Sequence, residues 1–167
     1  MGSESWPPWE VVNLARNLGD LEELVGAILG ESPGADHLSW LARLLIVRSS
    51  GYVEQSVREL ARAFVERKSG GFVRSFAQSW LERTHNPSPE SLVGLLGRFD
   101  ATLAREFEAF LDDDDQRLRR DLSFMVDRRN RIAHRLNESV GPARAVALAQ
   151  VAREVTDWFI LRLNPLR

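Results

Sequence analysis

Apolar residues recur at intervals of three and four along almost the whole chain, and strict alternation of apolar and polar residues is nearly absent. The first pattern is typical of amphipathic helices, whereas alternation would indicate half-buried strands. Short segments containing glycine or proline separate the periodic stretches. The sequence therefore predicts an all-α fold, a compact bundle of about six to seven helices without an internal repeat.

Turn residues and caps set the expected helix boundaries. Asp36 can cap the second helix by accepting hydrogen bonds from free amides of its first turn. The apolar phase of that helix changes at Ser49–Gly51, which allows a kink there. Asp112–Asp115 is expected to begin a new helix, because acidic residues favour the positive end of the helix dipole. The expected helices are 9–30 (with a break allowed at Gly19–Asp20), 36–68, 72–81, 89–97, 100–111, 112–136 and 142–163.

The chain has 167 residues and no cysteine. Disulfide scaffolds, thiol nucleophiles and thiolate zinc sites are thereby excluded. No secretory signal and no apolar run of about 18 residues is visible, so we expect a soluble, cytoplasmic protein without a membrane segment. We expect residues 1–35 to form an N-terminal helical extension and residues 36–167 to form one helical domain.

Charge is unevenly distributed although the formal net charge is only −2. Residues 1–47 contain seven acidic residues and two arginines, a net charge of −5. Residues 117–135 contain seven arginines and two aspartates, a net charge of +5. A net charge of −2 excludes a surface that is uniformly basic and binds nucleic acid on all sides. We therefore look for function in the basic stretch, residues 117–135.

Arg129 lies within the apolar stripe of the expected helix 112–136. A guanidinium at such a position breaks the apolar pattern and is costly to bury unless it is paired. Such violations often mark functional sites. A structural ion pair with Glu54 explains Arg129 about equally well. The stripe consists of Leu118, Leu122, Met125, Ile132 and Leu136.

His134 follows Arg129 by five residues, which places it roughly 140° around the helix, so the two side chains do not stack on one face. They can converge more easily from two copies of the helix packed about a two-fold axis. Asn130 is one turn before His134 and is suited to orient the imidazole. Taken alone, a histidine beside arginines is more often a solvated surface residue.

The segment Arg129–His134 reads R-N-x-x-x-H and resembles the active-site signature of HEPN (higher eukaryotes and prokaryotes nucleotide-binding) domains. The wider chain is similar to the RiboL-PSP branch of that superfamily over roughly residues 36–163. The resemblance implies a helical bundle, a homodimer with two facing motifs, and metal-independent endoribonuclease activity in catalytic members. The similar segments are Arg48–Glu54, Ser56–Leu60, Asn86–Pro87, Leu95–Asp100 and Arg128–His134.

The motif residues suit RNA cleavage by transesterification. Histidine exchanges protons near neutral pH, so His134 can serve as general base or acid, while Arg129 can contact a phosphate with two donors. The product would be a 2′,3′-cyclic phosphate. We therefore expect Arg129, Asn130 and His134 to be catalytic, with no metal and no cofactor. The expected substrate-binding residues are Arg128, Arg131, Arg135, Arg48 and Glu54.

Several alternatives compete with this interpretation. Arg48 and Glu54 can line the cleft, but structural pairing is favoured for them. Asp112–Asp115 resembles a metal-binding run, and helix capping is favoured there. The chain can also be a non-catalytic HEPN adaptor that binds RNA, a nucleotide or a protein, or a generic monomeric helical module with an internally paired Arg129.

The biological setting expected for the nuclease is a toxin or defence system acting on RNA, with an antitoxin or a nucleotidyltransferase as a further partner. Many toxin members carry a tyrosine two residues after the histidine, which a partner nucleotidyltransferase modifies. Leu136 occupies that position here. The resemblance therefore gives no support for regulation by that route.

Overall fold

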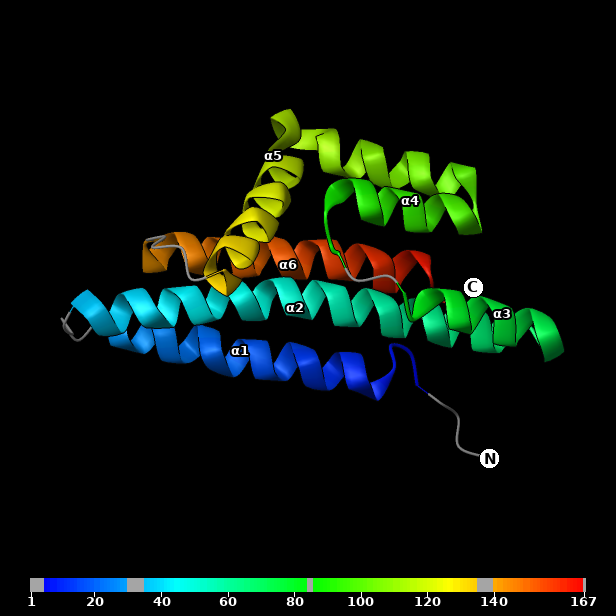
Figure 1. Cartoon of the computed structure of the whole chain (residues 1–167), viewed down its shortest axis with the longest axis horizontal. Helices are drawn as coiled ribbons and strands as arrows, with labels where there is room; N and C mark the ends of the chain where they lie inside the picture. The colour runs from blue at the N-terminus through cyan, green and yellow to red at the C-terminus, as the bar shows by residue number, and fades with distance from the viewer. Residues whose placement is uncertain (1–4, 30–34, 84–85, 135–139, 167) are drawn as a thin grey trace.

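The computed structural model describes residues 5–29, 35–83, 86–134 and 140–166, and these form an all-α bundle, as the sequence predicts (Figure 1). No strand occurs within these ranges. The helices are α1 (Trp9–Leu29), α2 (Ala35–Lys68), α3 (Gly71–Leu81), α4 (Pro89–Phe99), α5 (Ala101–Ala133) and α6 (Pro142–Arg162).

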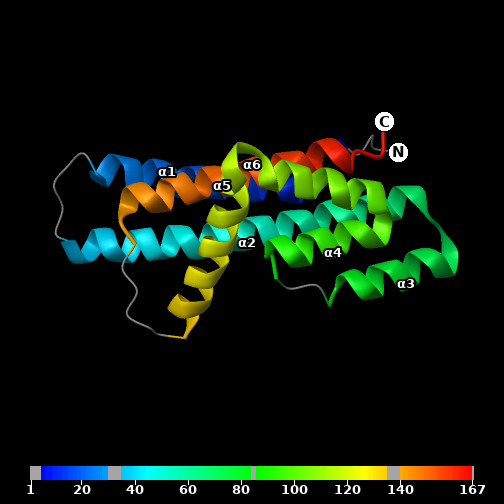
Figure 2. The same cartoon turned by 90° about the horizontal axis from the view of Figure 1, so that it is seen from above.

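Three long helices, α1, α2 and α6, run side by side and form the body of the bundle (Figures 1 and 2). The short helix α4 pairs with the first half of α5 on one side of this body, and α3 packs against the end of α2. The second half of α5 turns away from α4 and crosses α2 (Figure 2). This crossing places the second half of α5 against α2.

The turn within α5 lies at the acidic run. Asp113 has an extended backbone, and Asp114, Asp115 and Gln116 have positive φ angles of 49°, 53° and 60°. Residues other than glycine rarely adopt this left-handed conformation, although aspartate tolerates it better than most. The expected boundary between two helices thus appears as a sharp bend within one element, and this bend directs the second half of α5 across α2.

Helix α2 passes through Ser49–Gly51, where the sequence allows a kink, as one continuous element. The Ser49 hydroxyl donates a hydrogen bond of 2.7 Å to the Leu45 carbonyl, four residues earlier. A buried serine can satisfy its hydroxyl in this way without leaving the helix. The change of apolar phase instead lets α2 contact different helices along its length.

Helix α1 is part of the same hydrophobic core as the other helices. Val11, Leu18 and Val25 are buried on the side of α1 that faces α2 and α6. Glu22, an acidic residue of this segment, accepts a 3.0 Å hydrogen bond from Nε of Arg153 in α6. The acidic N-terminal segment is thereby tied to α6. Among the described helices, none is long and apolar enough to cross a membrane.

Phe107 is fully buried, and its ring contacts those of Trp158 and Phe159, with centroid distances of 4.8 and 5.1 Å. We expect Phe107→Ala to lower the free energy of unfolding by about 3–5 kcal/mol, because it removes apolar burial and leaves a cavity. Chemical denaturation measures this loss. Phe72→Ala is the matched control, since Phe72 is 96% exposed, and its effect should stay within about 0.5 kcal/mol. Equal losses in the two variants would contradict this account of the core.

Candidate functional site

Arg129 lies in the second half of α5, where that helix crosses α2. The stripe residues Leu118, Leu122 and Met125 are buried as expected, Ile132 is half-buried, and Leu136 lies outside the described residues. The Arg129 side chain is 30% exposed, so it is neither solvated like a surface arginine nor sealed in the core. Its position on the stripe explains this intermediate burial.

Glu54 of α2 holds the Arg129 guanidinium. The distance from Arg129 Nη2 to Glu54 Oε2 is 3.0 Å, and the Glu54 side chain is only 16% exposed. The ion pair considered from the sequence is therefore present. Within the described part of the chain, this carboxylate is the one partner of the guanidinium, and an arginine has five N–H donors. Arg129 is thus oriented by Glu54 and retains donors for a second anionic group.

His134 ends α5, and its side chain is exposed to solvent. Its backbone N–H donates a 3.1 Å hydrogen bond to the Asn130 carbonyl. Asn130 is also exposed, and the described contacts include no hydrogen bond between the two side chains. Because His134 and Arg129 project roughly 140° apart, one protomer does not bring them together on one face. Each is nevertheless open to solvent near the same end of α5.

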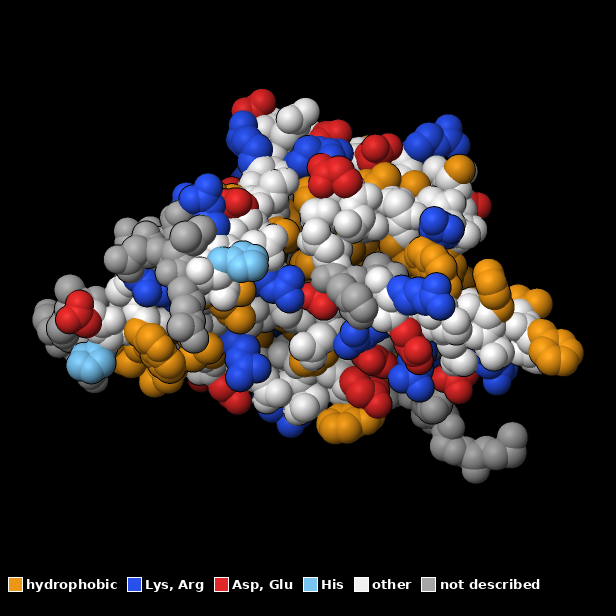
Figure 3. Space-filling view, in the orientation of Figure 1, with side chains coloured by type: hydrophobic (Ala, Val, Ile, Leu, Met, Phe, Trp, Pro, Cys, Tyr) orange, Lys and Arg blue, Asp and Glu red, His pale blue; other side chains and the backbone are white. Residues whose placement is uncertain are grey.

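The basic stretch is largely neutralised by nearby carboxylates. Arg131 lies 3.2 Å from Asp127, Arg128 stacks over the Phe124 ring at 4.7 Å, and Arg135 lies outside the described residues. Figure 3 shows the result for the described residues on one face, where Lys and Arg side chains lie beside Asp and Glu side chains. The other arginine pairs of this stretch are Arg117 with Asp114 and Glu154, Arg119 with Asp112, and Arg120 with Asp115.

These pairs also explain the acidic run Asp112–Asp115. Three of its carboxylates contact arginines of the same helix, across or beside the bend. Within the described ranges, no group of three or more histidine, aspartate or glutamate residues is placed to hold a metal ion. His37 is exposed on α2, and His85 lies outside the described residues. The run thus shapes the bend in α5.

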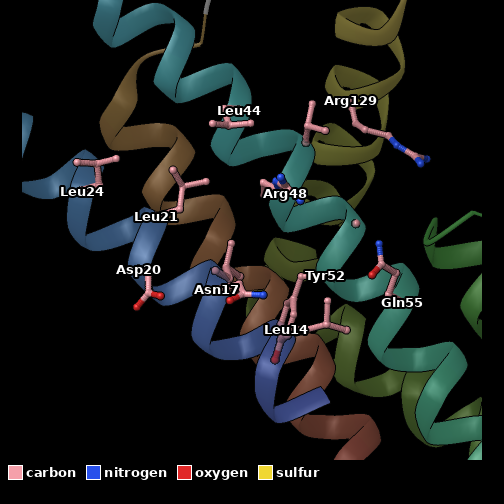
Figure 4. Close-up of a pocket in the computed structure, with 13 residues that line it drawn as sticks. Leu14, Asn17, Asp20, Leu21, Leu24, Leu44, Arg48, Tyr52, Gln55 and Arg129 are labelled. Atoms are coloured by element: carbon pink, nitrogen blue, oxygen red, sulfur yellow. The ribbon is translucent and has the colours of Figure 1, made fainter. Parts of the chain in front are cut away.

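A groove of about 620 Å³ runs between α1 and α2 and reaches Arg129 (Figure 4). Leucine side chains from both helices form its walls, and Tyr52 lies at its base, where burial raises the pKa of the phenol. Arg48 lines the groove and is exposed, with no ion pair to any described residue. The sequence favours structural pairing for both Arg48 and Glu54, and among the described residues this holds only for Glu54. Glu54 is in an ion pair with Arg129, and Arg48 is at the groove.

Asn17 and Gln55 also line this groove, one on α1 and the other on α2 (Figure 4). Sequence reasoning did not identify them, because the groove exists only where α1 packs against α2. The one available signal was the half-exposed apolar edge of α1, where Leu14 and Leu21 extend the stripe beyond the buried Leu18. That signal predicts a helix packing edge and does not by itself predict a cavity.

Comparison with known proteins identifies one family. The family described as RiboL-PSP-HEPN matches residues 13–157, from the first half of α1 to near the end of α6. Searches of curated proteins and of solved structures find no significant match. The match spans most of the chain and contains both the Arg129–Glu54 pair and His134. The chain belongs to the RiboL-PSP-HEPN family.

Proposed function

We propose that the protein is a metal-independent endoribonuclease whose active site forms between two copies of the chain. Membership of the HEPN family suggests a ribonuclease or RNA-binding function. The observation that carries the proposal is the state of Arg129, which is held by Glu54 at the edge of an open groove and keeps unused donors.

The proposed reaction is attack of an RNA 2′-oxygen on the adjacent phosphorus. The neutral imidazole of His134 from one copy takes the 2′-OH proton, and the protonated imidazole of the second copy gives a proton to the leaving 5′-oxygen. Arg129 donates hydrogen bonds to the charged oxygens of the transition state. The products are a 2′,3′-cyclic phosphate and a free 5′-hydroxyl. DNA has no 2′-OH and would not be cleaved.

Two copies are required because of where the groups lie on α5. Arg129 and His134 point in different directions from one helix, roughly 140° apart. A two-fold axis near the end of α5 would place the His134 of each copy beside the Arg129 of the other. His134 is exposed, and the second half of α5 crosses α2 (Figure 2), so a partner copy would meet this end of α5 first. Asn130, exposed on the same turn, would then orient the imidazole or the phosphate.

A second candidate is a non-catalytic adaptor that binds RNA, a nucleotide or a protein through the same surface. The Arg129–Glu54 ion pair favours it, since a pair within one protomer is also what a purely structural arginine would form. The biological role proposed for the enzyme is that of a toxin or defence ribonuclease in the cytoplasm, which an antitoxin or nucleotidyltransferase would accompany.

The test uses purified full-length protein and total RNA in EDTA. We expect RNA fragments that end in 2′,3′-cyclic phosphate, and light scattering should give twice the chain mass of 18.9 kDa. EDTA should leave the rate unchanged, because the proposed reaction uses no metal. A monomer, or cleavage that EDTA abolishes, would overturn the composite metal-independent site. RNA binding without cleavage would favour the adaptor.

A further inference from the structure

The groove between α1 and α2 has the properties of a ligand pocket as well as those of a packing edge. Its volume, about 620 Å³, falls within the range of about 300–1,000 Å³ that small-molecule sites occupy. Leu21 and Leu24 line it on α1 and Leu44 lines it on α2, so part of its wall is apolar (Figure 4). This part can hold a flat, largely apolar group of the size of a nucleobase.

Polar groups are placed around this apolar interior. Asn17 on α1 and Gln55 on α2 are exposed amides, each with donors and an acceptor, and both line the groove. Amides are suited to read the hydrogen-bonding edge of a base, which presents donors and acceptors in a fixed order. Arg48 lines the same groove as an exposed cation without an ion pair to any described residue, and Asp20 of α1 lines the groove as well.

Arg129 connects this groove to the proposed cleavage site. It comes from α5, across α2, and is itself one of the lining residues (Figure 4). The guanidinium extends away from the other labelled lining residues (Figure 4) and is held by Glu54, so a phosphate on it would lie at the rim of the groove, with Arg48 available for the next phosphate along the strand. An apolar protein side chain in the groove would make no ion pair with Arg48. A nucleotide supplies both the apolar body and the anion.

We propose that the α1–α2 groove is a base-binding pocket, which receives an unstacked base of single-stranded RNA next to the phosphate that Arg129 contacts. The pocket would give the enzyme its preference for one base beside the cleaved bond. This inference rests on the proposed function, because it takes RNA as the ligand and Arg129 as the phosphate contact. Duplex RNA keeps its bases stacked and would not enter.

Gly51 allows the groove to be filled without disturbing the core. A Cβ atom at this position would meet only the Gln55 side-chain amide, at 3.9 Å. Gly51→Leu therefore places an apolar side chain in the groove and also favours the helix, since glycine is a poor helix former. Gly26→Leu is the matched control, because Gly26 is an exposed glycine of α1 with nothing within 4 Å of its Cβ position.

The experiment measures binding in a His134→Ala background in EDTA, so that RNA remains uncleaved. Fluorescence anisotropy gives the Kd of labelled octamers of adenosine, cytidine, uridine and inosine. We expect Gly51→Leu to raise the Kd of the preferred octamer at least tenfold and to make the four Kd values similar. In Gly26→Leu, each Kd should stay within twofold of its value in the His134→Ala background. Arg48→Gln should weaken all four octamers alike and lower their salt dependence, as loss of a phosphate contact does.

Three results would overturn the pocket: unchanged Kd values in Gly51→Leu, a uniform loss that leaves base preference intact, or conversion of a dimer to a monomer. Should Gly51→Leu not fold, the double variant Asn17→Ala/Gln55→Ala removes only exposed amides. It should reduce the ratio between the highest and the lowest of the four Kd values at least threefold. Unchanged preference in that variant would also overturn the pocket. Cleavage by the parent protein is scored separately. Cleavage with no pocket effect refutes only this inference, and base-selective binding without cleavage refutes only the nuclease.

Discussion

Replacing His134 with alanine should slow RNA cleavage by about 10²- to 10⁴-fold, the usual contribution of a general acid–base residue. The imidazole has no structural partner among the described residues and is exposed at the end of α5. Its removal should therefore leave the fold and the RNA affinity nearly unchanged. Initial rates of cyclic-phosphate formation at saturating RNA, measured in EDTA, would show the loss as a change in kcat rather than in KM.

His37→Ala provides the matched control for this variant. His37 is also an exposed histidine, on the first turns of α2, and no described interaction involves its side chain. We expect its cleavage rate to equal that of the parent protein. Equal activity in His134→Ala would show that the observed cleavage comes from another group or from a contaminant. Loss of activity in His37→Ala would show that removal of any exposed histidine disturbs the assay.

Much of the fold follows from local sequence patterns. The stripe Leu118–Leu122–Met125 is buried as its spacing predicts, and Ser88 begins α4 by accepting a hydrogen bond from the Ser91 amide. Caps and apolar periodicity are decided within a few residues of chain, so the sequence contains the necessary information. The sequence also allows two explanations of Arg129, a functional one and an ion pair with Glu54. The ion pair is predictable because a guanidinium within an apolar stripe requires a partner, and the structure contains it.

The path of α5 was not predictable in the same way. The sequence indicates a boundary near Asp112–Asp115, but the direction of the chain after it depends on three consecutive residues with positive φ. Aspartate tolerates that conformation better than most residues but does not require it, so the local sequence does not fix the direction of the chain. This same bend determines where Arg129 and His134 lie, so the site depends on a feature that only the folded chain reveals.

The charge pattern was similarly incomplete as a guide to the site. A net charge of +5 over residues 117–135 suggests a basic RNA-binding face, yet the folded chain pairs most of these arginines with carboxylates that are distant or outside the counted stretch. Arg48, outside that stretch, lines the groove without an ion pair to a described residue. Net charge along a sequence does not report which charges meet after folding, and that pairing sets the local field.

Arg129→Ala should reduce kcat by about 10²- to 10³-fold, the effect expected when one preorganised donor to a transition-state oxyanion is lost. The change also leaves the Glu54 carboxylate half-buried without its partner, which lowers stability. Thermal unfolding monitored beside the rate separates the two effects. A low, non-denaturing concentration of guanidinium should restore part of the rate, because the small cation can occupy the vacated position beside Glu54. A structural defect alone would not respond in this way.

Two further variants complete this test of Arg129. Arg129→Lys keeps the charge but lacks the planar pair of donors, so we expect it to be more stable than Arg129→Ala and still markedly impaired. Arg120→Ala is the matched control, since Arg120 is an exposed arginine of the same helix whose partner, Asp115, lies at the bend. It should retain the parent rate. Full activity in Arg129→Lys would reduce the role of Arg129 to that of a simple positive charge and would refute two-donor recognition of the phosphate.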